Sequence, residues 1–348
     1  MLIKHSKIPF FEIASIGVLP SFLKSIVYRF KGYKIGKHVK FGFGSVIIGK
    51  KVEIGDHVKV GLLTVIRGHE IQIEKYATIG SFTFIDSGKL RIGEDSRINE
   101  QVIIGGMKTP ESSLDLGKRT IIMEYSYINT TMPVKIGDDT GIGGHCLLFT
   151  HGSWLNQLEG FPVNFAPIEI GKSVWLPWRV FVMPGVTVGD KVVIGANSLV
   201  SKSIKSNCLV AGAPAKLIKE NFPTPLTKSE KQEKFTFMVN EFIRYLEYHD
   251  IKVESEILSS KIIITAEKHD SKAVFFFDTS KDYEALISKK EMLFVVNISD
   301  DDMQLPNQIQ KNTMFLDLNK KQRLGTSKIG EEFVKFVSRY GLRFARMD

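Results

Sequence analysis

A repeat of six residues is the feature that most constrains the fold of this chain. Between Ile170 and Lys205 it reads IGKSVW, LPWRVF, VMPGVT, VGDKVV, IGANSL and VSKSIK, and an aliphatic residue opens every block. With 43% hydrophobic residues in the chain, six such openings in a row arise by chance about 0.6% of the time. A helix requires a period of about 3.6 residues and a plain strand a period of about 2. The period of six predicts a parallel β-solenoid built from hexapeptides.

The physics of this period defines the expected coil. Each hexapeptide supplies one short strand and a turn, and three of them close a triangular coil of about 18 residues. The opening aliphatic side chain points inward and stacks on its counterpart one coil away, at a strand spacing of about 4.8 Å. A glycine or small polar residue follows it, as at Gly171 and Gly195, and suits a turn that needs a positive φ or a close backbone approach.

The solenoid is expected to occupy residues 34–220 as eight or nine coils, with two interruptions. One is Gly105–Asp115 and the other is Trp154–Pro167, after which the six-residue register resumes. Loops of this length inside a regular solenoid are commonly functional. The solenoid should end at AGAPAKLIKE with a short helix, because Gly212 and Pro214 break the strand pattern there.

The segments outside the repeat differ in composition. Residues 1–33 are apolar and partly helical, and we expect them to cap the open end of the solenoid. An interfacial helix that makes peripheral contact with a membrane, helped by nearby lysines and Arg29, is the alternative. Residues 221–234 are expected to form a linker, and residues 235–348 a small α/β domain without a motif that indicates its chemistry.

The net charge, the cysteine count and the hydropathy of the chain exclude several classes of protein. The net charge of +9 favours anionic partners, but the basic residues are scattered and form no nucleic-acid-binding motif, so we expect no nucleic acid. Two cysteines, Cys146 and Cys208, exclude a disulfide framework and suit a reducing cytoplasm. We expect no signal peptide and no segment that spans a bilayer. The expected location is the cytoplasm, including the inner face of the membrane.

The segment IGDDTGIGGHCLLFTHGSW, the loop after it and APIEIGKSVWLPWRVFVMPGVTVGDKVVIGANSLVSK together resemble the galactoside, maltose and polysaccharide O-acetyltransferases. The resemblance implies a left-handed parallel β-helix, a homotrimer with sites between subunits, and acetyl-CoA as co-substrate. The implied acceptor is a saccharide or sugar nucleotide in surface polysaccharide or glycan biosynthesis. His151 matches the family's catalytic base. An imidazole titrates near neutrality, so it can accept the hydroxyl proton as the oxygen attacks the thioester.

The end of the solenoid, AGAPAKLIK, resembles the family's closing motif, where basic residues meet the phosphates of coenzyme A. The matching positions are Trp175 in the pantetheine channel, Ala196 and Ser201 as backbone contacts, and Lys202, Lys216 and Lys219 at the phosphates. Trp178 stands where the family often has a small residue, so the resemblance implies a channel of a different shape here.

The acceptor site is expected near the Trp154–Pro167 loop. Trp154, Asn156 and Phe165 combine aromatic rings with an amide, which suits the apolar face and the hydroxyls of a sugar. The same residues would also suit packing on a neighbouring subunit. Asn129 and His145 are further candidate substrate contacts. A backbone carbonyl is the expected partner that orients His151, because Gly152 and not an acidic residue follows it.

Three other functions remain open at this point. A close variant is an N-acyltransferase that acts on a nucleotide-linked amino sugar. A zinc enzyme resembling the γ-carbonic anhydrases needs three converging histidines, and only His145 and His151 form a close pair. A non-catalytic scaffold would leave the working part in the C-terminal domain. We favour the O-acetyltransferase and expect no metal.

Overall fold

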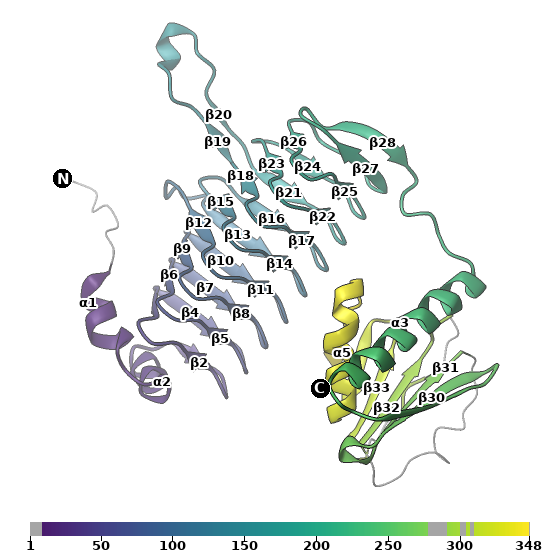
Figure 1. Ribbon diagram of the computed structural model, residues 1–348. Coiled ribbons are helices and arrows are strands. Elements are labelled where there is room, and N and C mark those ends of the chain that lie inside the picture. The colour runs from purple at the N-terminus through teal and green to yellow at the C-terminus, as the bar shows by residue number, and fades with distance from the viewer. Residues whose placement is uncertain (1–8, 278–290, 300–303, 307–309, 348) are drawn as a thin grey trace. The chain divides into compact units, whose positions relative to one another are not determined.

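The computed structural model describes residues 9–277, 291–299, 304–306 and 310–347. The chain divides into two compact units between Thr224 and Pro225, and each is described by itself. In the N-terminal unit, three sheets of parallel strands run along a stack of coils (Figure 1). The predicted parallel solenoid of hexapeptides is confirmed.

Each coil contributes one strand to each of three sheets. Sheet A contains β1 (Lys34–Ile35), β4 (Lys51–Ile54), β7 (Glu70–Ile73), β10 (Lys89–Ile92), β13 (Ser113–Leu116), β16 (Val134–Ile136), β21 (Ile168–Ile170) and β24 (Thr187–Val188). Sheet B contains β2 (Lys40–Phe41), β5 (Lys59–Val60), β8 (Thr78–Ile79), β11 (Arg97–Ile98), β14 (Ile121–Ile122), β17 (Gly141–Ile142), β22 (Trp175–Leu176), β25 (Val193–Ile194), β27 (Cys208–Ala211) and β28 (Lys216–Glu220). Sheet C contains β3 (Val46–Ile48), β6 (Val65–Arg67), β9 (Phe84–Asp86), β12 (Ile103–Gly105), β15 (Tyr127–Asn129), β18 (Leu147–Leu148), β23 (Phe181–Val182) and β26 (Leu199–Val200).

The opening aliphatic of each hexapeptide points into the core, as predicted. Leu176, Val182 and Ile194 have no exposed surface. The residue four places after the opening one is buried as well, as at Val180 and Val192. Two inward positions in every six residues therefore fill the interior of the prism.

The glycines after the aliphatics serve close approach rather than a positive φ. A Cβ at Gly195 would lie 2.6 Å from the Cβ of Ala211 in the next coil. The left-handed conformation falls two residues later instead, at non-glycine residues such as Arg179 (φ 60°) and Asn197 (φ 57°). Of the two reasons expected for a small residue at this position, the structure selects the proximity of the next coil.

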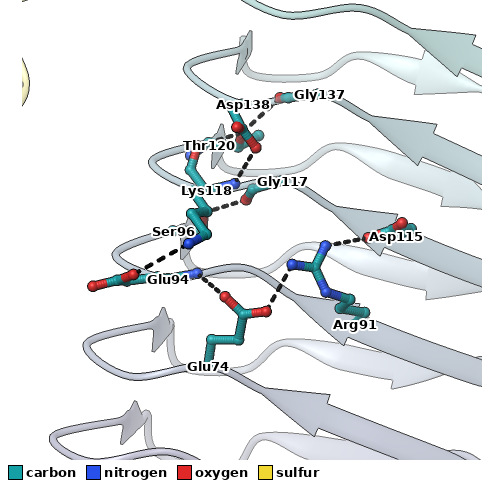
Figure 2. A network of polar contacts seen from close by, with 10 residues as sticks. All are labelled: Glu74, Arg91, Glu94, Ser96, Asp115, Gly117, Lys118, Thr120, Gly137 and Asp138. Carbon is teal, nitrogen blue, oxygen red and sulfur yellow. Dashed lines mark hydrogen bonds and ion pairs between the residues drawn. The ribbon is translucent and has the colours of Figure 1, made fainter. Parts of the chain in front are cut away.

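Polar side chains join successive coils at the corner between sheets A and B (Figure 2). The guanidinium of Arg91 donates to Glu74 at 2.7 Å and to Asp115 at 2.8 Å, so it links three coils. Inside the corner, the hydroxyl groups of Ser96 and Thr120 donate to backbone carbonyls of the next coil at 2.6 and 2.9 Å. Buried polar groups that replace an aliphatic here are thus satisfied within the chain.

The N-terminal segment is helical, as predicted, and comprises α1 (Phe10–Glu12), the π-helical turn η1 (Ile13–Gly17) and α2 (Ser21–Phe30). Helix α2 lies against the first coil. The Nζ of Lys24 donates to the carbonyl oxygens of Gly42 at 2.6 Å and Ser45 at 3.0 Å, and the Tyr28 hydroxyl accepts from the Ile47 N–H at 2.9 Å. Helix α2 therefore supplies partners for backbone groups of the first coil.

Lys24 predicts a pH dependence of stability. Its side chain is fully buried, and this desolvation lowers the pKa from 10.5 to about 8. Below pH 8 both the folded and the unfolded state hold the proton. Above it the folded state releases the proton first, so its free energy of unfolding should rise until about pH 10, by roughly 2–3 kcal/mol. Denaturant titrations between pH 8 and pH 10 should show this rise in the wild type and should not show it in Lys24→Met. If the free energy of unfolding depends on pH equally in the two proteins, the assignment to Lys24 is contradicted.

The end of the solenoid differs from the prediction. The predicted helix directly after Pro214 is replaced by β28, which folds back and pairs antiparallel with β27, so that Ala211 faces Lys216 and Leu209 faces Lys219. Strand β27 has a free edge in sheet B, and β28 pairs with it. This pairing outweighs the local preference for a helix that the sequence suggested. The predicted linker 221–234 is also shorter, because a capping box of Thr227 and Glu230 starts a helix at Lys228.

The C-terminal unit contains a mixed sheet in the order β29 (Val253–Ile257), β30 (Lys261–Ala266), β31 (Ser271–Phe276), β32 (Glu291–Val296), β33 (Thr313–Asp317), β34 (Gln322–Gly325) and β35 (Ala345–Met347). Helices α3 (Lys228–Tyr248) and α5 (Lys328–Val337) pack in one apolar cluster with one face of this sheet. Two short 3₁₀ turns, η3 (Lys268–Asp270) and η4 (Ser338–Tyr340), complete the described part of this unit. A cavity of about 420 Å³ lies here and contains none of the predicted site residues.

Candidate active site

His151 lies on a hairpin that leaves the solenoid at the corner between sheets C and A. Strands β19 (His151–Gly152) and β20 (Asn164–Phe165) pair antiparallel and place His151 opposite Phe165. The Ala166 N–H donates to the Thr150 carbonyl at 3.0 Å and closes the base of the hairpin. Figure 1 shows the hairpin extending away from the coils, with the 3₁₀ turn η2 (Gln157–Glu159) at its far end.

Aromatic rings hold the imidazole of His151. Phe165 stacks on it with ring centroids 5.7 Å apart and an interplanar angle of 15°, and the Phe149 ring lies 6.3 Å away. The residue is half-buried, and its Nδ1 is a buried atom without a hydrogen-bond partner in the described part of the chain. The predicted carbonyl partner for this ring is therefore not provided within the protomer. Nδ1 is thus the covered edge of the ring, and the opposite edge carries Nε2.

Asn129 is tied to the base of the same hairpin through Thr150. The Thr150 hydroxyl donates to the Asn129 Oδ1 at 2.9 Å and to its carbonyl at 3.0 Å, and the Thr131 N–H donates to the same Oδ1 at 3.1 Å. Asn129 is 1% exposed. The sequence did not single out Thr150. The six-residue register places Thr150 one coil after Asn129, and this register is the signal that could have identified it.

The structure does not bring the other predicted acceptor residues to His151. Trp154 is 96% exposed on the hairpin, and the Asn156 side chain caps η2 by accepting from the Leu158 N–H at 3.0 Å. His145 lies at the corner between sheets B and C, where its ring stacks on Tyr125 at 4.9 Å and meets the tilted ring of Trp178 at 5.6 Å. Among the loop residues predicted to contact the acceptor, only Phe165 touches the imidazole in the described structure.

The residues predicted to bind coenzyme A fall into three groups on the last coils. On sheet B, Trp175 is in register with Val193, Leu209 and Lys219 on successive strands, and Lys216 lies on the same last strand. Trp178 and Ala196 lie at the corner between sheets B and C in neighbouring coils. Ser201 and Lys202 follow β26 at the corner between sheets C and A, where His151 also lies.

This distribution separates the base from most of the predicted cofactor residues. Sheet C stands between the corner that holds His151 and the corner that holds Trp178. Ser201 lies on the side of His151, two coils further along the stack, which corresponds to roughly 10 Å. A ligand that touches all of these residues within one protomer would have to pass around the prism.

Cysteine and metal chemistry receive no support from the described residues. Cys146 is fully buried, and desolvation raises the pKa of its thiol to about 11, so the thiolate is scarce at neutral pH. The residues that the structure describes include no group of three His, Cys, Asp or Glu side chains placed to hold a metal ion. His145 and His151 lie at different corners of the solenoid, so they do not form the close pair of ligands that the zinc alternative requires.

Comparison with known proteins gives consistent matches to the solenoid. Residues 167–212 match the model for the hexapeptide repeat of succinyl-transferase. A putative colanic acid biosynthesis acetyltransferase from Escherichia coli is 31% identical over 134 residues, which are 37% of this chain and 71% of that protein. The chain belongs to the hexapeptide-repeat acetyltransferases. It is therefore an enzyme of this family, and the matches do not support the scaffold alternative.

Two further relatives of this acetyltransferase come from Escherichia coli. A putative lipopolysaccharide biosynthesis O-acetyl transferase is 36% identical over 28% of this chain and 56% of its own length. The galactoside O-acetyltransferase is 32% identical over 40% of this chain and 57% of its own length. Among solved structures, a galactoside acetyltransferase in complex with coenzyme A matches 60% of this chain and 76% of its own at 20% identity, with a TM-score of 0.28.

Proposed function

We propose that this acetyltransferase moves an acetyl group from acetyl-CoA to a hydroxyl of a saccharide in surface polysaccharide or glycan biosynthesis. The observation that carries the proposal is the half-buried imidazole of His151, flanked by Phe149 and Phe165 at the base of the hairpin. The relatives support the acceptor class, because their names refer to colanic acid, lipopolysaccharide and galactoside.

In this proposal the Nε2 of His151 accepts the proton of the acceptor hydroxyl while the oxygen attacks the thioester carbonyl. The tetrahedral intermediate collapses, the carbon–sulfur bond breaks, and the imidazolium returns the proton to the thiolate of coenzyme A. The products are an acetyl ester and free coenzyme A, and no covalent acyl-enzyme forms. Phe165 and Phe149 offer ring faces to the apolar face of a sugar.

The proposal includes a homotrimer with left-handed coils and with sites between subunits. Two features support this assembly. The hairpin exposes apolar side chains that a monomer would leave in water, with Trp154 and Leu158 each 96% exposed. His151 and most of the predicted cofactor residues also stand at different corners of one prism. A neighbouring copy would complete the site and supply the missing partner of Nδ1. Sedimentation of the wild type should show three chains per particle, and a monomer would contradict this part.

For coenzyme A we propose Trp175 and Trp178 along the pantetheine arm, Ala196 and Ser201 as backbone contacts, and Lys202, Lys216 and Lys219 at the phosphates. Their exposure supports this role, since all three lysines are exposed. We place the reaction in the cytoplasm.

The experiment that tests the proposed function is thiol release from acetyl-CoA in the presence of free sugars, sugar nucleotides and glycans. We expect release that depends on the acceptor and saturates with it. Release that is equal with and without every acceptor would count against acetyl transfer to saccharides. An amino-sugar nucleotide as the only active acceptor would favour the N-acyltransferase instead.

A further inference from the structure

Helix α2 exposes large apolar side chains to solvent, whereas an amphipathic surface helix normally buries them. Its buried residues are Lys24 and Tyr28, which contact the first coil. Its opposite face consists of Phe22, Ile26 and Phe30, which are 65%, 43% and 89% exposed. A helix on the surface of a globular protein normally directs its apolar residues inward and its polar residues to solvent. The face of α2 that contacts the solenoid carries Lys24 and Tyr28, and the face with Phe22, Ile26 and Phe30 is left outside.

Helix α1 adds further exposed aromatic rings, since Phe10 and Phe11 are 71% and 81% exposed. We call Phe10, Phe11, Phe22, Ile26 and Phe30 the N-terminal apolar face. In the described part of the chain no single helix has the length and hydropathy of a membrane span, whereas Phe10–Gly17 and Ser21–Phe30 meet this test as a pair bent by 116°. Four phenylalanines on the surface of one short segment mark a binding surface rather than scattered exposure.

The charge next to this face identifies the kind of partner. Residues 21–60 contain nine Lys and Arg and two Asp and Glu, which gives a net charge of +7 within a chain whose total is +9, and one of the nine, Lys24, is buried against the first coil. Lys31 directly follows α2, Lys37, Lys40 and Lys50 lie in the first coil, and all four are exposed. An anionic lipid surface attracts such a cluster, and the hydrocarbon beneath its headgroups accepts apolar side chains. A second copy docked through the same face would instead bring two basic segments together.

We propose that the N-terminal apolar face binds the surface of a membrane that contains anionic phospholipids. The phenylalanines and Ile26 enter the boundary between headgroups and acyl chains, while the surrounding lysines meet the phosphates. The inward face of α2 stays on the first coil, so the same helix contacts the solenoid and the lipid at once. This goes beyond the proposed function, because it holds whichever acceptor is used, and it would bring the enzyme to glycans carried on lipids.

The test is vesicle flotation of the full chain. Vesicles of phosphatidylcholine with phosphatidylglycerol should bind the wild type, and raised salt should weaken the binding. Phe22→Ser with Phe30→Ser should lower the partition coefficient by roughly 100-fold, since interfacial binding scales with buried apolar area. The matched control is Phe237→Ser, because Phe237 is 57% exposed on α3, outside this face, and this variant should bind like the wild type.

Two outcomes would overturn the proposal. Equal vesicle binding by the wild type and the double variant would remove the apolar face from the contact. A wild type that does not bind vesicles but loses its oligomeric state in the double variant, measured by sedimentation, would make the face a protein interface. Acetyl transfer to a soluble acceptor should be unchanged in the double variant, so a failure of membrane binding is distinguishable from a failure of the proposed function.

Discussion

Replacing His151 by alanine is expected to lower kcat by roughly 10²–10⁴-fold, the usual contribution of a general base. The reason is that a sugar hydroxyl is a weak nucleophile until a base accepts its proton. Because the base acts in the transition state, kcat should fall while the KM for acetyl-CoA changes little. Steady-state thiol release with a saturating acceptor measures both constants.

The matched control is His57→Ala. The ring of His57 stacks between His38 and Tyr76 at 4.8 and 5.0 Å in the early coils, far along the stack from the hairpin. This variant removes an imidazole from the same solenoid, and its turnover should stay near that of the wild type. Unchanged turnover in His151→Ala, or an equal loss in both variants, would exclude His151 as the base.

The second large effect is expected on stability. Leu176 is fully buried in sheet B, in register with Ile142 of the coil before it. Leu176→Ala removes three carbon atoms and their hydrogens from a close-packed column, and the neighbouring coils are held by their strand hydrogen bonds and cannot collapse far into the gap. The free energy of unfolding of the N-terminal unit should fall by about 2–5 kcal/mol.

Denaturant titration followed by the tryptophan fluorescence of the solenoid measures this loss. The control is Glu169→Ala on β21, because this side chain is exposed and should change the unfolding free energy by less than about 0.5 kcal/mol. A loss in Leu176→Ala as small as in the control would contradict the predicted packing of opening aliphatics in the core.

The fold of the solenoid was predictable because its period is a property of the sequence itself. Two inward positions in six residues recur from coil to coil, and burial of Val180, Leu176 and Ile194 follows from them directly. The hairpin of β27 and β28 was not predictable in the same way. Gly212 and Pro214 indicate only that a strand ends, whereas the free edge of sheet B that β28 occupies exists only after the coils have stacked.

The candidate site was predictable in part. The sequence pointed to His151 and to Phe165, and the structure stacks the two rings. It could not show that Trp154 is left exposed, because a loop of mixed aromatic and amide residues suits a sugar and a protein neighbour equally well. It also could not show the orientation of α2, since the positions of Phe22 and Lys24 follow helical spacing whichever face is turned inward.

The central claim is that an acetyl ester forms on a saccharide. The direct measurement is mass spectrometry of the glycan after incubation with acetyl-CoA and the enzyme, followed by mild alkali. The account predicts a mass increase of one acetyl group that alkali removes and that His151→Ala fails to produce. An acetyl group that resists alkali would make the product an amide, and the absence of any transfer to saccharides would contradict the claim.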